Sequence, residues 1–373
     1  MDAPRHLVGR VLDGRYRLDG ILNAGGMGIV FEATQLTVGR KVAVKVLKPT
    51  LSTDPSLVER FYLEVELVAG ISHPNVVQLI DSGRDAGGVT YLVMEFVEGK
   101  TLRQALRAGD LRLWEILYVF SQVCAALIEA HGQQIIHRDL KFDNIMISRM
   151  RDGRIHAKLL DFGVAKLLSR DVGLTMGGQV TGTPGIIAPE LVDGEGPSAQ
   201  SDLYSLGVLL FTALTGRAPF SAENDLALMR AHKTEPLPNM RKILVGRVPE
   251  EVIDLAGELL AKEPEMRPKS AEAVRRRLDL MAHSLRERAP DATSYHPPQT
   301  TGLEEEEESS LGITDVELFF KAESQKERPG LLGVIFPRPV VAPMTVVAAL
   351  AMILMVLIMV LIYLIYQQMM AAA

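Results

Sequence analysis

The chain has 373 residues, of which 47% are hydrophobic and 23% charged, so it can bury a large core and form two or three structural units. Its single cysteine, Cys124, excludes an intramolecular disulfide and fits a reducing compartment. The net charge is −6, but the run Glu304–Glu308 supplies most of the negative excess, so the balance predicts no nucleic-acid partner.

The chain is expected to be α+β, with a small strand-rich part followed by a larger helical part. Residues 1–15 are expected to form an N-terminal tail. Short apolar runs and glycine-rich turns then alternate over residues 16–106, which is typical of strands. One helix interrupts them: Asp54 can cap it and Pro55 suits its first turn. Over residues 114–281 the apolar positions mostly follow helical spacing.

A glycine loop, a lysine and a glutamate in the first part indicate a nucleotide site. Gly25 and Gly28 lie between two apolar runs, and glycines let backbone amides approach phosphates closely. Lys45 follows Gly28 by 17 residues, on a strand that is apolar on both faces, so its ammonium needs a partner. Glu64 falls within the apolar stripe of the expected helix. We therefore predict a Lys45–Glu64 pair that aims the ammonium at phosphates; the alternative, a snorkelling surface lysine and an unrelated glutamate, is plausible for either residue alone but not for both.

Polar residues crowd between apolar runs in the middle of the chain. Asp139, Lys141 and Asn144 lie within six positions, and Asp161 follows in an Asp-Phe-Gly sequence. Charged groups held against a core are costly unless they are paired or bind a cation. Two acids and an amide supply a proton acceptor and oxygen ligands for hard divalent metals. This combination suits phosphoryl transfer.

The C-terminal part is predicted to be a linker and a membrane anchor. Residues 281–343 carry prolines and an acidic run and are expected to be a mostly disordered linker. Residues 344–366 contain no charge and span roughly 34 Å as a helix, enough to cross a hydrocarbon core of about 30 Å. Lysines and arginines precede this helix but are absent from residues 367–373, so the preceding part is expected on the cytoplasmic side, with a short outer tail.

Taken in order, the motifs resemble the protein-kinase signature set, and the bacterial eukaryotic-type Ser/Thr kinases in particular. The resemblance covers residues 16–280 and implies a bilobal kinase fold, with an N-lobe over 16–97, a C-lobe over 98–280 and a single C-terminal transmembrane helix. The motifs that carry it are Gly25-x-x-Gly28, Val42-Ala43-Val44-Lys45, Glu64, His137-Arg138-Asp139-Leu140-Lys141, Asn144, Asp161-Phe162-Gly163, Gly182-Thr183-Pro184 and Ala188-Pro189-Glu190.

The resemblance implies ATP as phosphoryl donor and magnesium as metal, with manganese a possible substitute. Asp139 would accept or orient the acceptor hydroxyl, and Lys141 would neutralise the migrating phosphoryl group. Asn144 and Asp161 would hold the metal ions. Catalysis would also use Lys45 with its helix partner. The residues implied to surround the nucleotide are Leu22, Gly25, Gly28, Val30, Lys45, Glu95 and Val97.

Two further residues would support the site, and four would regulate it. The resemblance implies that Asp202 braces the catalytic loop and that Arg267 is the buried partner of Glu190. Lys141 favours Ser/Thr over Tyr specificity. The four residues expected to carry regulation are Arg138, Thr175, Thr181 and Thr183. The first would pair with a phosphate on the activation segment, the next two rank first and second as autophosphorylation sites, and the last would contact the catalytic Asp139.

Three departures from the family pattern concern the loops. Asn23 replaces the usual first loop glycine, which predicts a stiffer loop. Ile186-Ile187 replaces the usual Tyr-Met beside the acceptor residue, which leaves substrate preference open. Phe142-Asp143 follows Lys141 where Pro-Glu is usual, a swap for which the sequence offers no mechanism.

The predicted function is a Ser/Thr protein kinase in membrane-associated bacterial signalling. It would be anchored in the lipid bilayer of the inner membrane with its kinase domain cytoplasmic, and self-association would allow trans-autophosphorylation. The main alternative is a catalytically weak pseudokinase, an ATP-binding scaffold at the membrane; the presence of every catalytic group disfavours it. Small-molecule kinases share the Asp139–Asn144 spacing but generally lack a segment like residues 182–190.

Overall fold

The computed structural model describes residues 7–25, 28–47, 62, 65–66, 69–162, 184–288 and 293–298. The chain divides into two units, Met1–Ser324 and Gln325–Ala373, and every described residue lies in the first. Some predicted features therefore lie outside the described residues: Glu64, Gly163, Thr175, Thr181, Thr183, residues 299–343 of the linker, the membrane helix 344–366 and the tail 367–373.

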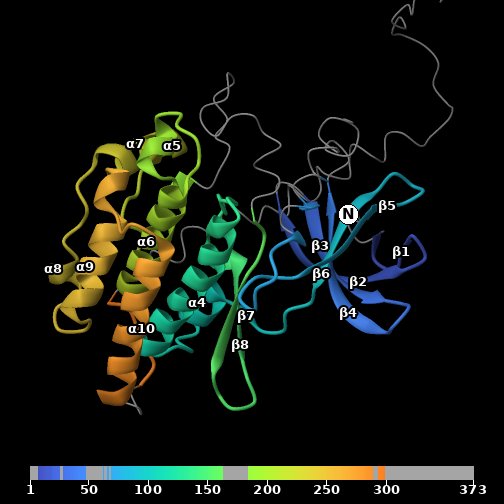
Figure 1. Cartoon of the computed structure of the whole chain (residues 1–373), viewed down its shortest axis with the longest axis horizontal. Helices are drawn as coiled ribbons and strands as arrows, with labels where there is room; N and C mark the ends of the chain where they lie inside the picture. Colours follow the sequence, from blue (N-terminus) through green and yellow to red (C-terminus); the bar gives the residue numbers. More distant parts are fainter. Residues whose placement is uncertain are drawn as a thin grey trace, which may run out of the picture. The chain divides into compact units, whose positions relative to one another are not determined.

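A six-stranded antiparallel sheet builds the first part of the chain (Figure 1). Its strands are β1 (Val11–Leu12), β2 (Tyr16–Gly25), β3 (Gly28–Gln35), β4 (Arg40–Leu47), β5 (Leu79–Arg84) and β6 (Thr90–Glu95). They are arranged in the order β1-β2-β3-β4-β6-β5. Alternate residues such as Val42, Val44 and Val46 are buried on one face, as expected for period-two strands. Because β4 lies between β3 and β6, Lys45 sits inside the sheet.

The predicted N-terminal tail is too long, because the chain from Leu7 onward is already packed on the N-lobe. Leu7 and Leu12 are 4% and 0% exposed and pack in the core of this lobe. The short strand β1 pairs with β2, and Arg10 forms a 2.7 Å ion pair with Asp85 at the far side of the sheet. Burial of the two leucines orders the chain around them, which the turn-rich composition of this segment did not indicate.

The interlobe connection depends on Asn75, which follows the expected N-lobe helix. Its side-chain amide donates to Oε1 of Gln122 at 3.0 Å and to the carbonyl of Ala157 at 2.8 Å. Its own carbonyl accepts the N–H of Leu159 at 2.8 Å. All these groups are buried or part-buried, so a single amide ties the segment between the lobes to α4 and the small sheet of the C-lobe.

The second part is mainly helical, so the structure has the two predicted lobes, a β-rich one followed by an α-helical one (Figure 1). The helices are α3 (Leu102–Arg107), α4 (Leu113–Gly132), α5 (Pro189–Val192), α6 (Ala199–Thr215), α7 (Asp225–Thr234), α8 (Met240–Ile243), α9 (Glu250–Leu259) and α10 (Ala271–Arg288). A three-stranded sheet, β7-β8-β9, lies beside them, with strands Lys100–Thr101, Ile145–Arg149 and Ile155–Leu159. Short 3-10 turns cover Phe142–Asn144, Pro184–Ile186 and Pro264–Met266.

Helix α4 is the core of this lobe. Among the described residues it is the helix that is long and apolar enough to cross a membrane, but 72% of its most apolar window is buried inside the protein. Helices α6 and α10 pack against it, and α9 packs against α6. A helix buried at the centre of a protein core can be as long and as apolar as a membrane span. The apolar composition of α4 is therefore best explained by its packing inside the lobe.

The linker predicted from residue 281 begins later in the structure. Helix α10 continues to Arg288, with Ala282 buried in the core. Tyr295 then returns to the C-lobe, donating its N–H to the carbonyl of Leu111 at 2.8 Å and its hydroxyl to the carbonyl of Leu214 at 2.6 Å. These two bonds of Tyr295 attach the segment to the C-lobe, although its prolines and polar residues predicted a solvated linker.

Two helical glycines differ in the space around them, so the same substitution should change the stability of the fold in opposite directions. A Cβ on Gly207 in α6 would lie 2.7 Å from the Leu259 Cβ and 3.1 Å from its backbone carbon, whereas a Cβ on Gly257 in α9 would meet nothing within 4 Å. We expect Gly207→Ala to destabilise the fold by about 1–3 kcal/mol through overpacking. We expect Gly257→Ala to be neutral or to stabilise by up to about 1 kcal/mol. Chemical unfolding of both variants checks this, and equal shifts would contradict the tight α6–α9 contact.

Candidate active site

One buried carboxylate organises the loop that carries the predicted catalytic residues. Asp202 lies in the first turn of α6 and is 1% exposed. Its Oδ2 accepts the N–H of His137 at 2.9 Å and contacts Nε2 of His131 at 2.8 Å, and its Oδ1 accepts the N–H of Arg138 at 3.0 Å. Arg138 has φ +65°, a backbone conformation that non-glycine residues rarely adopt. The carboxylate therefore holds the loop in a shape that it would not keep alone.

His137 joins this loop to the Asp161-Phe162 segment. Its side chain is fully buried, and burial lowers the pKa of the imidazole, which keeps it neutral. Nε2 lies 3.0 Å from the carbonyl of Leu160, and the ring packs against Phe162 with 4.8 Å between centroids. Nδ1 accepts the N–H of Asp139 at 3.3 Å. A neutral imidazole can make both contacts, as one donor and one acceptor.

Asp139, Lys141 and Asn144 converge as their spacing predicts. The ammonium of Lys141 lies 3.3 Å from Oδ2 of Asp139. The amide nitrogen of Asn144 donates to the carbonyl of Asp139 at 2.8 Å and to its Oδ2 at 3.1 Å. The carboxylate is thus oriented from two sides while remaining part-exposed, which suits a group that receives a proton from a ligand.

Lys45 reaches the same region from β4. Its Nζ forms a 2.7 Å ion pair with Oδ2 of Asp161, and its side chain is 14% exposed. Asp161 has φ +39°, so a second residue of the site is held in an unusual backbone conformation. The predicted Lys45–Glu64 pair stays a prediction, because Glu64 lies outside the described residues.

The donor chemistry of this cluster fits a magnesium-nucleotide complex. Asn144 directs its amide nitrogen at Asp139, which leaves its side-chain oxygen as the atom to offer a cation. Asp161 adds carboxylate oxygen, and both are the hard ligands that magnesium prefers. Within the described residues no group of three or more His, Cys, Asp or Glu could hold a metal by itself.

The predicted nucleotide-binding residues lie along β2, β3 and β6. Gly25 and Gly28 face each other across the β2–β3 turn. Gly28 must be glycine because a Cβ would lie 2.2 Å from the carbonyl oxygen of Val46. Leu22 is exposed and Val30 half-buried on the strands beside this turn, so both remain available to contact a ring.

The predicted hinge, Glu95 and Val97, follows β6. Oε1 of Glu95 forms a 2.5 Å ion pair with Lys158 on β9 and accepts the N–H of Gln78 at 2.8 Å. Val97 packs against a small apolar cluster that includes Leu92 and Met94. These side-chain contacts fix the backbone that the resemblance assigns to adenine.

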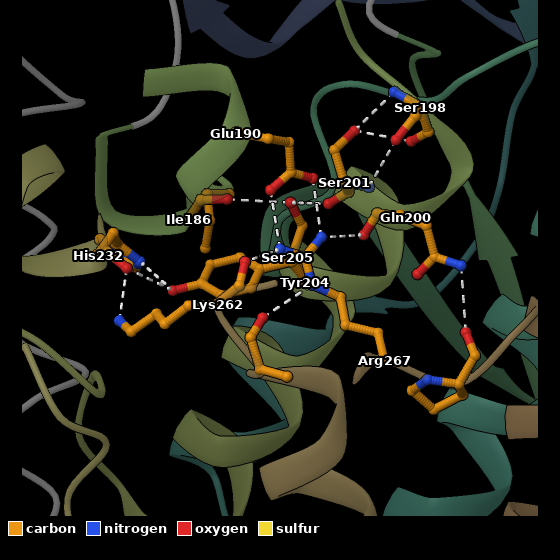
Figure 2. A network of polar contacts seen from close by, with 12 residues as sticks. Ile186, Glu190, Ser198, Gln200, Ser201, Tyr204, Ser205, His232, Lys262 and Arg267 are labelled. Atoms are coloured by element: carbon orange, nitrogen blue, oxygen red, sulfur yellow. Dashed lines mark hydrogen bonds and ion pairs between the residues drawn. The ribbon is translucent and has the colours of Figure 1, made fainter. Parts of the chain in front are cut away.

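A second polar cluster lies beneath the loop that precedes α5 (Figure 2). Arg267, 0% exposed, forms two parallel 2.8 Å bonds to the carboxylate of Glu190. It also donates to backbone carbonyls of Gln200, Ala261 and Lys262. This bidentate geometry is the strongest form of carboxylate recognition available to a side chain, and it fixes α5 to the body of the lobe.

A model of the protein kinase domain matches residues 16–278. The chain belongs to the protein kinase family. Similar proteins include serine/threonine-protein kinase pkn3 of Myxococcus xanthus, 38% identical over 276 residues, which are 73% of this chain and 50% of that protein.

Two further kinases show how much of each relative the resemblance covers. Serine/threonine-protein kinase Pkn1 of Myxococcus xanthus is 40% identical over 282 residues, 75% of this chain and 40% of that protein. Serine/threonine-protein kinase PknA of Mycobacterium tuberculosis is 38% identical over 301 residues, 79% of this chain and 67% of that protein. The chain thus spans half or less of the Myxococcus relatives, and what they share is the kinase domain.

The structure also gives the Phe142-Asp143 departure from the kinase pattern a role. Nε of Arg103 on α3 lies 3.0 Å from both carboxylate oxygens of Asp143, and the guanidinium lies 5.6 Å from the ring centre of Phe142. The catalytic loop of the kinase domain is therefore tied to α3. Sequence reasoning missed this pair, because neither residue lies in a pattern that marks it as buried or paired.

His232 on α7 gives the kinase domain a pH-dependent stability. The ring is fully buried, and burial lowers its pKa from 6.5 to about 4, with the nearby Lys262 ammonium acting in the same direction. At a pH between 4 and 6.5 the imidazole is protonated in the unfolded chain but stays neutral in the native protein. The free energy of unfolding is therefore highest above pH 6.5 and falls as the pH decreases toward 4.

We therefore expect wild type to lose about 2 kcal/mol more unfolding free energy than His232→Phe when the pH is lowered from 7 to 5. Urea unfolding of both proteins at the two pH values measures the difference, and all other titrating groups are common to both. Parallel losses would show that His232 is not held neutral in the native kinase.

Proposed function

We propose that the chain is a Ser/Thr protein kinase that transfers the γ-phosphoryl group of ATP to Ser and Thr hydroxyls of proteins. The observation that carries this proposal is the convergence of Asp139, Lys141 and Asn144 with the Lys45–Asp161 pair. The names of the relatives, all serine/threonine-protein kinases, support it.

Each residue has a distinct task in this reaction. Asp139 accepts the proton of the acceptor hydroxyl, since its carboxylate is oriented by Asn144 but still part-exposed. Lys141, 3.3 Å away, stabilises negative charge next to that carboxylate. Lys45 supplies positive charge beside Asp161, and Asn144 and Asp161 would hold magnesium. Bound magnesium and ATP would supply charge neutralisation and the transferable phosphoryl group.

The acceptor is proposed to be protein because of the segment that ends in Glu190. Its described part, residues 184–190, packs against α6 and α7 and is held by bonds from Arg267 to Glu190 and from Ser205 to Ile186. The resemblance assigns this region to recognition of the peptide around the acceptor, and small-molecule kinases generally lack it. Lys141 supports Ser/Thr rather than Tyr as the acceptor.

We further propose that residues 344–366 anchor the kinase in the bacterial inner membrane with its catalytic domain in the cytoplasm. The uncharged run and the basic residues upstream support this orientation. Confinement to a bilayer raises the effective concentration of neighbours and so favours trans-autophosphorylation. Thr175 and Thr181 are the proposed sites, with Arg138 as the phosphate partner.

Removing the proposed proton acceptor tests the reaction. We expect Asp139→Asn to lower kcat by at least about 100-fold, because general-base groups contribute roughly 10²–10⁴ in rate. Transfer of radiolabelled phosphate to myelin basic protein, followed by phosphoamino-acid analysis, measures both rate and acceptor type. Asp152→Asn is the matched control, because Asp152 lies in an exposed turn and pairs with Arg154. A fully active Asp139→Asn protein, or label on tyrosine alone, would overturn the proposal.

Diluting the kinase on a membrane surface tests anchoring and trans-autophosphorylation. The full chain is reconstituted in liposomes at constant protein and increasing lipid, and label per molecule is measured. We expect the initial rate to fall as lipid increases, and the label to be lost in the Thr175→Ala, Thr181→Ala double variant. A chain ending at residue 298 keeps the Tyr295 contact and serves as the unanchored control. A rate independent of lipid would indicate a reaction within one molecule.

A further inference from the structure

The short 3-10 turn Phe142–Asn144 follows Lys141 and ends at Asn144, one of the proposed metal ligands. At the start of the turn, the carbonyl of Lys141 accepts the N–H of Asn144 at 3.0 Å. At its end, the carbonyl of Asn144 accepts the N–H of Leu160 at 2.7 Å, directly before Asp161. A change in the shape of this turn would therefore move Asn144 relative to Asp161, the other proposed metal ligand.

The guanidinium of Arg103 holds the middle residue of this turn. Nε lies 3.0 Å from Oδ1 and 3.0 Å from Oδ2 of Asp143, and Nη2 lies 3.0 Å from Oδ2, so the contact engages both carboxylate oxygens. The side chain of Arg103 is 12% exposed and that of Asp143 is 37% exposed. The guanidinium also lies 5.6 Å from the ring centre of Phe142, which is buried. Arg103 therefore contacts both residues that precede Asn144 in the turn.

The support that carries Arg103 is itself well fixed. Arg103 lies in the first turn of α3, where Thr101 and Gln104 form a capping box with bonds of 3.0 and 3.2 Å. Thr101 also pairs with Met146 on β8, the strand that directly follows the 3-10 turn. The helix on one side of the turn and the strand on the other are thus joined to each other. The ion pair from Arg103 completes a short ring of contacts around the turn.

An Asp143 carboxylate without this partner would disturb a metal site at Asn144 in two ways. Carboxylate oxygen is a hard ligand, so it would compete for magnesium with the neighbouring amide oxygen. Its negative charge would also oppose the phosphates of a nucleotide, because charges act on one another over about 8 Å at physiological ionic strength. Arg103 binds both oxygens and offsets the charge, which removes both effects.

We propose that Arg103 is a positioning residue for the metal ligand Asn144. It holds Asp143 against α3, so that the turn keeps its shape and the carboxylate stays out of the metal site. Residues that orient metal ligands from outside commonly set the affinity for the metal. The role also explains Phe142-Asp143 in place of the usual Pro-Glu: proline would fix one φ of the turn, and without it an outside contact has to restrict the backbone. This inference rests on the proposed kinase function.

Binding of Mn²⁺ to the full-length protein tests the proposal without depending on turnover. Mn²⁺ is titrated in the presence of a non-hydrolysable ATP analogue, and free Mn²⁺ is measured by its EPR signal. The variants are Arg103→Leu, Asp143→Ala and the double variant that carries both changes. Arg154→Gln is the matched control, because Arg154 also pairs through Nε with an aspartate, Asp152, but in an exposed turn.

We expect Arg103→Leu to weaken Mn²⁺ binding roughly 3- to 10-fold, the range of one net hydrogen bond. The KM for a peptide acceptor should change less than about 2-fold. The losses of the two single variants should not add, and the double variant should bind Mn²⁺ at least as tightly as Arg103→Leu, because the released carboxylate is then absent. Arg103→Lys keeps the charge but not the planar fork and should lie between wild type and Arg103→Leu. Arg154→Gln should bind Mn²⁺ like wild type.

The outcomes separate this inference from the proposed function. A wild-type protein that neither binds Mn²⁺ with the analogue nor labels myelin basic protein overturns the kinase proposal and this inference with it. An active wild type whose Mn²⁺ affinity is unchanged in Arg103→Leu, or whose single losses add in the double variant, overturns the positioning role alone. An Asp143→Ala protein in which only the KM for the peptide changes does so too, since Asp143 would then contact the acceptor. If Arg103→Leu does not fold, Arg103→Lys decides by the same titration.

Discussion

The active site of this kinase depends on the burial of one carboxylate. Asp202 sits at the start of α6 with almost no exposed surface and accepts hydrogen bonds from two consecutive backbone amides, those of His137 and Arg138. Burying an ion is unfavourable unless its oxygens are satisfied, and here the amides and the His131 ring satisfy them. The positive φ of Arg138 is maintained by these contacts, and it is this turn that delivers Asp139 to the surface.

The same helix also supports the loop before α5. Within its first two turns, Asp202 faces the catalytic loop, Ser205 holds Ile186, and Tyr204 holds His232. A rigid helix positions side chains more accurately than a loop does, because its backbone hydrogen bonds leave little freedom. The catalytic loop and the loop before α5 are therefore both held by α6, although they are more than 40 residues apart in the chain.

The sequence predicted which polar residues of the candidate site lie together, because these residues belong to short motifs whose spacing is set by one tight turn. Asp139, Lys141 and Asn144 lie together as expected. The two-lobed architecture also agrees with the prediction. Contacts across long separations carried no such signal. Arg103 with Asp143 and Asn75 with Gln122 pair polar residues over 40 and 47 positions, and neither pair stands in a recognisable pattern. Both the predicted tail and the predicted linker were drawn too long for a related reason.

That reason is the contribution of a few well-placed apolar groups. Leu7 lies just before the kinase domain and Tyr295 just after it. Each packs on the domain from turn-rich or proline-rich surroundings, where the average composition indicates solvated chain. Burial of one large side chain contributes roughly 1.5–3 kcal/mol, which is enough to order a short flanking segment on an existing core. Composition averages over a window, whereas docking depends on one residue and on a surface formed elsewhere in the chain.

The Glu190–Arg267 pair shows why stability alone does not account for the polar interior. Replacing a buried ion pair with well-packed apolar residues is often neutral or stabilising, so a gain in stability is a weak explanation for a pair of this kind. What apolar residues cannot supply is the planar fork that fixes the direction of Glu190 and the beginning of α5. Because α5 is fixed in this way, the loop before it has a defined orientation, and Ser205 can bind the carbonyl of Ile186. The buried charges are best explained as the contact that fixes the loop before α5 in one orientation.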